Sequence, residues 1–448
     1  MSICSSENIV ALATPPGLGA LAIVRLSGSN LYSMYRDFSH KNPINRRAVF
    51  SKIYHPISKK LLDEAVITYF KSPNSFTGED VIEISCHGGA VVPRSIIMAA
   101  IDSGARNAVP GEFSFRAFLN GKIDLLQAEA ISSLISSKST FSADVSLQHL
   151  LGRVSTILSE IKEDALNMLS IIENELDFSE GELDLTSYDD IRIKVVGIKE
   201  KLIDILKSST FGMDAISGIR VVILGKPNSG KSSLFNAILG FDRAIVSSSP
   251  GTTRDTVESY FELGGVSICL IDTAGIWESE KFLDQLGVEK TLSAINNSNI
   301  CFLVDDEDPS ILLKYDFSNL IKDRSVLVKS KCDLNGSSFD SNKNVYPVSA
   351  KNNFGIDKLL THLSTYISET VNNQSLIDHI FITHRQRALL ESSLSAIDVL
   401  IKQIDSGIKT DLLASGLRGF VAILRDVLGG VHNEDVLNNI FSNFCVGK

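Results

Sequence analysis

Residues 225–232 restrict the fold of this chain more than any other part of the sequence. They read G-x-x-x-x-G-K-S, follow the apolar run 219–224 and precede an apolar helical pattern at 233–239. Glycines at such positions let backbone N–H groups close around phosphates at the N-terminus of a helix. In this strand–loop–helix context Lys231 is expected to reach the β- and γ-phosphates of a nucleotide, and the Ser232 hydroxyl to bind Mg²⁺. The pattern predicts a parallel sheet flanked by helices.

Two further motifs follow in the order found in nucleoside triphosphatases. The sequence G-T-T-R-D at 251–255 lies in a polar segment suited to a mobile loop. Its Thr253 is placed to bind Mg²⁺ when the γ-phosphate is present. A second apolar run, 266–271, ends in D-T-A-G at 272–275. Asp272 is expected to hold Mg²⁺ through water, and the Gly275 N–H to bond the γ-phosphate.

The base is predicted to be guanine. The tetrapeptide S-K-C-D at 330–333 stands where guanine-specific proteins usually carry N-K-x-D. Asp333 can accept hydrogen bonds from guanine N1 and N2, which adenine cannot offer. The tripeptide S-A-K at 349–351 matches the loop whose backbone covers guanine O6. Ser330 replaces the usual asparagine and shortens one polar support, so a lowered affinity for GTP is expected.

The full set expected to bind GTP comprises Asn228, Ser229, Gly230, Lys231, Ser232, Ser233, Ser247, Ser248, Ser249, Pro250, Gly251, Thr252, Thr253, Asp272, Thr273, Ala274, Gly275, Ser330, Lys331, Asp333, Ser349, Ala350 and Lys351. The group that activates water is not fixed by these motifs. The residue after D-T-A-G is Ile276, and an apolar side chain cannot orient the attacking water as a glutamine does. A carboxylate of the following segment is expected to do so, and the candidates are Glu278, Glu280 and Asp284.

The regions on either side of the nucleotide motifs show two other sequence patterns. Residues 1 to about 120 mix short Val- and Ile-rich runs with Gly and Pro clusters, which predicts a small α/β domain. Leucine and isoleucine recur with the helical period from Leu147 to Ile172 and again after residue 375, which predicts one long helix in the first region and a shared helical bundle. The expected domains are 1–121 (α/β), 122–216 (helical, first part), 217–373 (an inserted Ras-like P-loop G domain) and 374–448 (helical, second part).

The net charge and the spacing of the cysteines argue against several classes of protein. The net charge of −10 argues against a nucleic-acid binder driven by general electrostatics, although a local basic cleft for one RNA remains compatible with it. The six cysteines lie far apart, as expected for reduced thiols of a cytoplasmic protein. Neither a membrane span nor a signal peptide is expected from the sequence.

Motifs outside the G domain resemble the tRNA-modification GTPase family MnmE, also called TrmE. They are A-T-P-P-G-L-G-A-L-A-I-V-R-L-S-G at 13–28, F-T-G-E-D at 76–80 with Glu83, H-G-G at 87–89, P-G-E-F-S-F-R-A-F-L-N-G-K-I-D-L at 110–125 and F-C-V-G-K at 444–448. A general small GTPase has none of them, and the resemblance runs nearly from end to end.

The resemblance implies that the N-terminal domain binds a 5-formyl or 5,10-methylene tetrahydrofolate and makes a constitutive homodimer. Arg25, Glu83, Lys122 and the C-terminal Lys448 would line the folate pocket. Cations suit the glutamate carboxylates of folate, and a carboxylate suits the amino-pyrimidine edge of the pterin. A nucleophilic role for the neighbouring Cys445 would need an activating base, which the pattern does not assign, so Cys445 is expected instead to position Lys448.

The resemblance also implies that the G domains dimerise in the presence of K⁺, with Asn228 as one ligand and Ser247, Ser249 and Thr252 as the others. A cation there would neutralise charge in the transition state. The family's catalytic glutamate, nine residues beyond the glycine of D-T-A-G, falls on Asp284. Asp284, Lys231 and Thr253 are therefore the expected catalytic residues, and Ser232 and Thr253 the Mg²⁺ ligands.

The function that the resemblance implies is modification of tRNA. With the FAD-dependent partner MnmG, in a heterotetramer or larger complex, the protein would add an aminomethyl or carboxymethylaminomethyl group to C5 of the wobble uridine of certain tRNAs. The folate would supply the carbon, and GTP hydrolysis would drive conformational change. The alternative is a regulatory or ribosome-assembly GTPase that binds RNA without modifying it. Such proteins usually add a basic module, whereas this chain is acidic.

Overall fold

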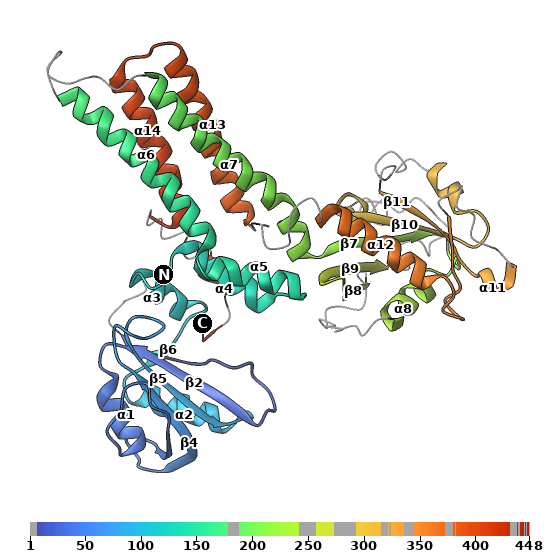
Figure 1. Ribbon diagram of the computed structural model, residues 1–448. Coiled ribbons are helices and arrows are strands. Elements are labelled where there is room, and N and C mark those ends of the chain that lie inside the picture. Colours follow the sequence, from blue (N-terminus) through green and yellow to red (C-terminus); the bar gives the residue numbers. More distant parts are fainter. Residues whose placement is uncertain are drawn as a thin grey trace. The chain divides into compact units, whose positions relative to one another are not determined.

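The computed structural model describes residues 7–177, 188–241, 257–272, 293–314, 321, 324–335, 345–371, 380, 382–430, 437, 440–442, 444, 446 and 447. The chain divides into two compact units. The first comprises Met1–Ser132, His149–Lys199 and Leu389–Lys448, and the second comprises Ser133–Gln148 and Glu200–Ala388. Figure 1 shows one sheet in each unit and long helices in the first.

The sheet of the first unit has the strand order β3-β4-β5-β2-β1-β6. Its strands are β1 (Ile9–Leu12), β2 (Leu21–Gly28), β3 (Val49–Tyr54), β4 (Leu61–Phe70), β5 (Asp80–His87) and β6 (Arg106–Asn107). Neighbouring strands run antiparallel except β1 and β6, which are parallel. Helices α1 (Leu31–Ser39) and α2 (Val92–Asp102) bury their apolar faces against it, so that Tyr35, Phe38 and Ile96 share a core with Ile67 and Ile84.

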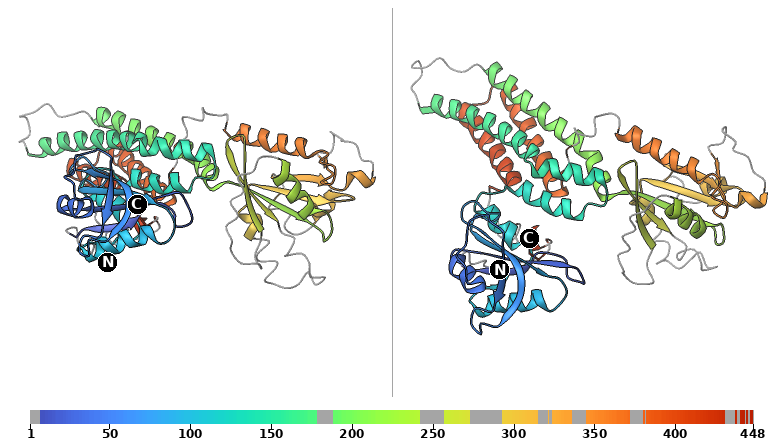
Figure 2. Two further views of the ribbon diagram at one scale, coloured as in Figure 1. Left: turned by 90° about the horizontal axis from the view of Figure 1, so that it is seen from below. Right: turned by 60° about the horizontal axis from the view of Figure 1, so that its bottom comes forward.

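Long helices lie side by side in the first unit, as Figures 1 and 2 show. They are α6 (Arg153–Asp177), α14 (Thr410–Leu428), and the parts of α7 (Tyr188–Ser217) up to Lys199 and of α13 (His384–Asp405) from Leu389 that belong to this unit. The ion pair Arg418–Glu173 (2.6 Å) joins α14 to α6, and the pair Arg192–Asp405 (2.7 Å) joins α7 to α13. Two segments far apart in sequence therefore form one bundle, as their apolar stripes predicted.

The single long helix expected from the first stripe is wrong. Helix α5 (Thr140–Leu150) ends before Gly152, and α6 begins at Arg153. Gly152 has a φ of +86°, a left-handed conformation that interrupts an α-helix and that glycine adopts without steric cost. Apolar residues continue with the same period on both sides of this break, so periodicity alone could not reveal it.

Helices α3 (Glu112–Leu119) and α4 (Leu125–Ser136) follow the first sheet and pack with the end of the chain. Phe441 and Phe444 share a small core with Leu125 and Ala128. Gly111, just before α3, has a φ of +70°, and a Cβ there would lie 2.3 Å from the carbonyl oxygen of Phe441. The close backbone approach therefore requires glycine at this position.

The sheet of the second unit has the order β12-β11-β10-β7-β9-β8. Its strands are β7 (Ile219–Gly225), β8 (Val257–Leu263), β9 (Val266–Asp272), β10 (Ile300–Asp305), β11 (Ser325–Lys329) and β12 (Val345–Pro347), all parallel except β8. The unit also contains α8 (Lys231–Phe241), the 3₁₀ helix η1 (Pro309–Lys314), α11 (Cys332–Asn335) and α12 (Ile356–Val371). The expected multidomain α/β and all-α architecture, with a parallel-rich sheet in the G domain, is confirmed.

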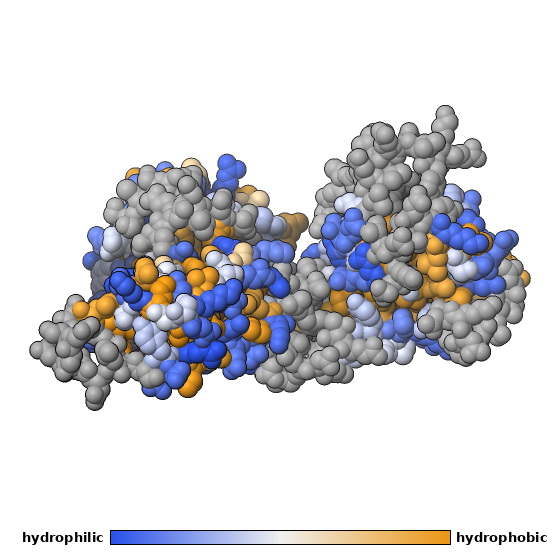
Figure 3. All heavy atoms as spheres, turned by 90° about the horizontal axis from the view of Figure 1, so that it is seen from above, coloured by the Kyte–Doolittle hydropathy of each residue, from blue (hydrophilic) through white to orange (hydrophobic). Residues whose placement is uncertain are grey.

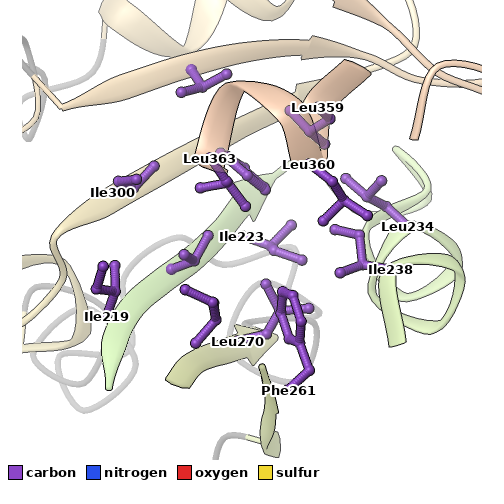
Figure 4. Packing of buried hydrophobic residues seen from close by; sticks show 14 of the residues in the cluster. Ile219, Ile223, Leu234, Ile238, Phe261, Leu270, Ile300, Leu359, Leu360 and Leu363 are labelled. Atoms are coloured by element: carbon purple, nitrogen blue, oxygen red, sulfur yellow. The ribbon is translucent and has the colours of Figure 1, made fainter. Parts of the chain in front are cut away.

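One core of this unit lies between the sheet and helices α8 and α12. Figure 4 shows Leu234 and Ile238 of α8 and Leu363 of α12 directed toward Ile223 and Leu270 of the strands. Two residues of α5, Phe141 and Val145, belong to the same buried cluster. The N-terminus of α5 is also bonded to the β8–β9 hairpin, because the Phe141 N–H donates to the carbonyl of Gly265 (3.0 Å).

On the face drawn in Figure 3, hydrophilic side chains are interspersed among hydrophobic ones. In the described part of the chain, every helix is too short or too polar to pass through a bilayer. Four cysteines in that part, Cys86, Cys269, Cys301 and Cys332, are buried free thiols. Burial raises the pKa of Cys86, to about 11, so this thiol is predominantly protonated at neutral pH.

Candidate functional sites

The expected phosphate loop joins β7 to α8 in the second unit. A Cβ on Gly225 would lie 2.2 Å from the Val304 carbonyl oxygen, and Gly230 has a φ of +91°, so both positions require glycine. The Lys231 ammonium donates to the carbonyls of Gly225 (3.0 Å) and Lys226 (2.8 Å). Its side chain is 5% exposed. The cation is thus held inside the loop that is expected to enclose phosphates.

Two of the residues expected around Mg²⁺, Ser232 and Asp272, meet at the start of α8. Asp272 ends β9, which pairs with β7 so that Asp272 lies opposite Ile223. The Ser232 hydroxyl donates to Oδ2 of Asp272 at 2.9 Å. A hydroxyl and a carboxylate at a helix N-terminus are oxygen donors of the kind that Mg²⁺ binds through one direct contact and one water. The residues present therefore fit the ion, although Thr253 lies outside the described residues.

Ser330 lies against the phosphate loop. Its hydroxyl donates to the Ser229 carbonyl at 2.5 Å, and its N–H donates to the Asp305 carbonyl at 2.9 Å. Its Cβ is 3.4 Å from the position that a Cβ on Gly230 would take. The shortened side chain thus still reaches the loop, by a direct contact that the sequence comparison with N-K-x-D did not anticipate.

The residues expected to bind the base lie together: Asp333 is in the short helix α11, and Ser349 is in the loop that follows β12. The Ser349 hydroxyl donates to Oδ1 of Asp333 at 2.8 Å and so orients this exposed carboxylate. Ser349 also exchanges two backbone hydrogen bonds with Phe354, which closes the loop that carries Ala350 and Lys351. The second oxygen of the Asp333 carboxylate can accept from a guanine edge while Ser349 holds the first.

Lys331 is held beside these loops by an acidic partner. Its ammonium binds Oδ2 of Asp306 at 2.9 Å, which lowers the pKa of Asp306. Asp306 follows the end of β10 and received no role from its sequence position. Acidic residues after a strand are frequent in loops, so the motif pattern gave no signal for it.

Several expected site residues lie outside the described residues. They are Ser247, Ser248, Ser249, Pro250, Gly251, Thr252, Thr253, Thr273, Ala274, Gly275, Asp284 and Lys448. Asn228 and Ser233 are described, and both are exposed at the phosphate loop. Asn228 has a φ of +61°, a conformation in which asparagine is enriched among residues other than glycine.

A second group of expected residues meets on the first sheet. Arg25 of β2 lies opposite Glu83 of β5, and its Nε and Nη2 both lie within 2.9 Å of Glu83 Oε1. Its Nη1 donates to the Gly447 carbonyl at 3.3 Å, so the end of the chain reaches this group. The Arg25 guanidinium also lies over the rings of Phe76 (5.6 Å) and Phe113 (5.8 Å), at cation–π distance.

Lys122 lies next to the loop that carries Phe76. A Cβ on Gly78, whose φ is +79°, would be 3.3 Å from Cε of Lys122, so the lysine side chain passes directly over this glycine. Asn120 donates from Nδ2 to the Thr77 carbonyl at 2.7 Å and holds the same loop. Two cations and a carboxylate thus belong to one small region of the first unit, which suits a ligand with both carboxylates and hydrogen-bond donors.

Fold and site together define the class of P-loop proteins with guanine-nucleotide motifs. A family model described as "GTP-binding protein TrmE N-terminus" matches residues 8–122, and one described as "MnmE helical domain" matches residues 125–445. The protein of Aliarcobacter butzleri described as "tRNA modification GTPase MnmE" is 36% identical over 99% of both chains. The protein of Koribacter versatilis with the same description is 35% identical over 99% of both. This chain belongs to the MnmE family of tRNA modification GTPases.

Among solved structures, the G domain of the Thermotoga maritima FeoB iron transporter is 23% identical, with a TM-score of 0.27. The match covers 33% of this chain and 98% of that domain. The family that the sequence motifs suggested is confirmed by the full-length relatives.

Proposed function

We propose that the second unit binds GTP through its phosphate loop and hydrolyses it. The supporting observation is the juxtaposition of Lys231, the Ser232–Asp272 pair and the Asp333–Ser349 pair at one edge of the parallel sheet. Ser232 would hold Mg²⁺ directly and Asp272 through water, and the ion would offset phosphate charge. Lys231 would exchange its two carbonyl partners for phosphate oxygens.

Hydrolysis would also require residues beyond this group. Thr253 would complete the Mg²⁺ shell, and Asp284 would orient the attacking water. Asn228, with Ser247, Ser249 and Thr252, would bind K⁺ between two associating G domains. A comparison of GTPase rates in K⁺ and in Na⁺ tests this part, because equal rates would remove the role given to Asn228.

The first unit would hold the one-carbon donor, a 5-formyl or 5,10-methylene tetrahydrofolate, in a homodimer. Arg25 and Lys122 would bind carboxylates of the folate, Glu83 would accept from its amino-pyrimidine edge, and Lys448 would add a further cation. The Arg25–Glu83 arrangement supports this assignment, since both side chains are less than one-third exposed and held in place. The group itself would supply the carbon that is transferred.

The substrate would be tRNA, in the cytoplasm where tRNA is modified. With the FAD-dependent MnmG in a heterotetramer or larger assembly, the protein would add an aminomethyl or carboxymethylaminomethyl group to C5 of the wobble uridine. The identity of 36% over the whole length of a relative described as a tRNA modification GTPase carries this proposal.

The decisive experiment is mass spectrometry of wobble uridines in tRNA from cells that lack the gene, with and without complementation. We expect the modified nucleoside to disappear and to return with the wild-type gene but not with Lys231→Ala. A Glu64→Gln gene, altered at an exposed ion pair of β4, serves as the matched control. Unchanged wobble uridines in the deletion strain would refute the assignment and favour an RNA-binding GTPase without modifying activity.

A further inference from the structure

Beneath the Arg25 site lies a buried ionic network that the proposed chemistry does not use. Arg116 of α3 is 1% exposed and Glu112 of the same helix is 0% exposed. The Arg116 guanidinium binds Glu112 Oε1 through Nη2 (2.9 Å) and Glu79 through Nη1 (3.0 and 3.2 Å). Arg106 adds two hydrogen bonds to Glu112, at 2.6 and 2.8 Å. Arg116 and Glu112 are the most deeply buried charged side chains in the described part of the first unit.

Glu112 is the anchor of the network. Its burial raises its pKa, but hydrogen bonds from Arg106, the Val109 N–H and Arg116 outweigh that effect, and the pKa is lowered overall. Arg106 in turn has a raised pKa because of its bond to Glu112. The Glu112 carboxylate is therefore charged at neutral pH.

The two carboxylates bound by Arg116 belong to segments that carry the aromatic neighbours of Arg25. Glu112 directly precedes Phe113, and Glu79 lies three residues after Phe76. The segment of Phe76 is tied further, because Ser27 donates to Glu79 Oε2 (2.7 Å) and lies 2.7 Å from the Thr77 hydroxyl. Ser27 is two residues from Arg25 on the same strand. Arg116 thus bridges the segments that contact the Arg25 guanidinium.

A purely stabilising role explains this arrangement poorly. Removing the Arg116 guanidinium and the Glu112 carboxylate from water costs so much that a buried ion pair adds little net stability compared with apolar residues of the same size. Its geometry, however, is strict, because each loss of a partner leaves a buried charge uncompensated. Such a network is suited to fixing the relative positions of the segments that it joins.

We propose that Arg116 and Glu79 are positioning residues for Arg25. They set the distance between the segments of Phe76 and Phe113 and thereby hold the Arg25 guanidinium, beside Glu83, in the orientation that receives a ligand carboxylate. The ligand part of this inference rests on the proposed folate role of Arg25. The positional part concerns the protein without ligand.

The first test uses the full-length protein without folate. Arg25 Nε donates to Glu83 (2.9 Å) beside two rings, so its Nε–H resonance should be displaced by ring currents and protected from exchange. The resonance is assigned by its loss in Arg25→Lys. In Glu79→Gln we expect it to shift and to exchange faster. Glu64→Gln, the same chemical change at an exposed pair of the same sheet, should leave it unchanged.

The second test measures binding of 5-formyltetrahydrofolate by calorimetry. Glu79→Gln should weaken binding about tenfold, the middle of the range for coupled neighbours. The double variant Arg25→Ala with Glu79→Gln should bind no more weakly than Arg25→Ala alone, because Glu79 acts through Arg25. If Glu79→Gln fails to fold, Phe76→Leu removes one ring contact and is expected to weaken binding in the same non-additive way.

The possible outcomes distinguish the folate role proposed for Arg25 from the positioning role proposed for Arg116 and Glu79. Wild-type affinity retained in Arg25→Ala would overturn the folate role of Arg25 but not the positional part, which the resonance decides. An affinity lost in Arg25→Ala but kept in Glu79→Gln, with an unmoved Arg25 resonance, would overturn the inference alone. Additive losses in the double variant would also overturn it, since they would mean that Glu79 acts independently of Arg25.

Discussion

Acidification should destabilise this protein through a single buried histidine. His149, near the C-terminus of α5, is 4% exposed. Burial, and then the charge of Arg153, lowers the pKa of His149 to about 4 from its ordinary value of 6.5. The folded state therefore keeps the imidazole neutral at pH values at which the unfolded chain binds a proton.

The direction and the magnitude of this loss of stability follow from proton linkage. Between pH 6.5 and 4 the unfolded state holds one more proton at this site, so the free energy of unfolding falls as the pH falls. The window is 6.5 − 4 = 2.5 pH units wide. At about 1.36 kcal/mol per unit, the loss from this one side chain reaches roughly 3 kcal/mol. Above pH 6.5 the contribution is fully present. The lowered pKa of Glu112 acts in more acidic solution, below its ordinary 4.5.

The assay compares wild type with His149→Gln across this window. Because the chain has two units, hydrogen exchange of α6 amides measures the local free energy of opening better than a global melting curve. We expect the wild type to lose about 3 kcal/mol more than His149→Gln between pH 6.5 and 4. The imidazole titration is followed directly by NMR. A midpoint above pH 6, or equal pH slopes in the two proteins, would refute the reasoning.

Three further predictions concern GTP binding and hydrolysis, and they are checked by measuring GTP affinity and turnover. Ser330→Ala removes the donor to the Ser229 carbonyl and should weaken GTP binding about tenfold, since a lost buried hydrogen bond costs about 1–3 kcal/mol; unchanged affinity would show that the bond does not organise the loop. Ser232→Ala should slow Mg²⁺-dependent turnover roughly a hundredfold while Glu64→Gln does not, because a phosphate-bound cation loses its direct ligand; a normal response to Mg²⁺ would contradict this. Asp284→Asn should abolish turnover and keep GTP binding, and normal turnover would place the catalytic carboxylate elsewhere.

Much of the second unit was predictable because its central strands are largely buried. The runs 219–224, 266–271 and 325–329 consist largely of apolar residues, and each ends in a motif, so length and punctuation identify them. They correspond to β7, β9 and β11. In contrast, β3 (Val49–Tyr54) is an edge strand that alternates exposed and buried residues, and no turn motif drew attention to it.

The functional sites also differ in how far the sequence could predict them. The contacts of Lys231 and Ser232 depend on neighbours within one loop and one adjacent strand, and the motif encodes that arrangement. The ionic network depends on Glu79 and Arg116 meeting across 37 positions of sequence. No local spacing encodes such a meeting, so both residues were part of recognisable motifs without an assigned role. The packing of Phe141 in the core of the second unit was hidden for the same reason.

The bond from Arg25 to the Gly447 carbonyl has a consequence for synthesis. The two residues are 422 positions apart. At roughly 5–20 residues per second, the ribosome takes on the order of 20–80 s to make the intervening chain. During that time α3, α4 and the region of Arg25 lack their contacts with Phe441, Phe444 and Gly447. Changes around Phe441, Phe444 and Gly447 should therefore disturb Arg25 and the helices α3 and α4, which are made far earlier in synthesis.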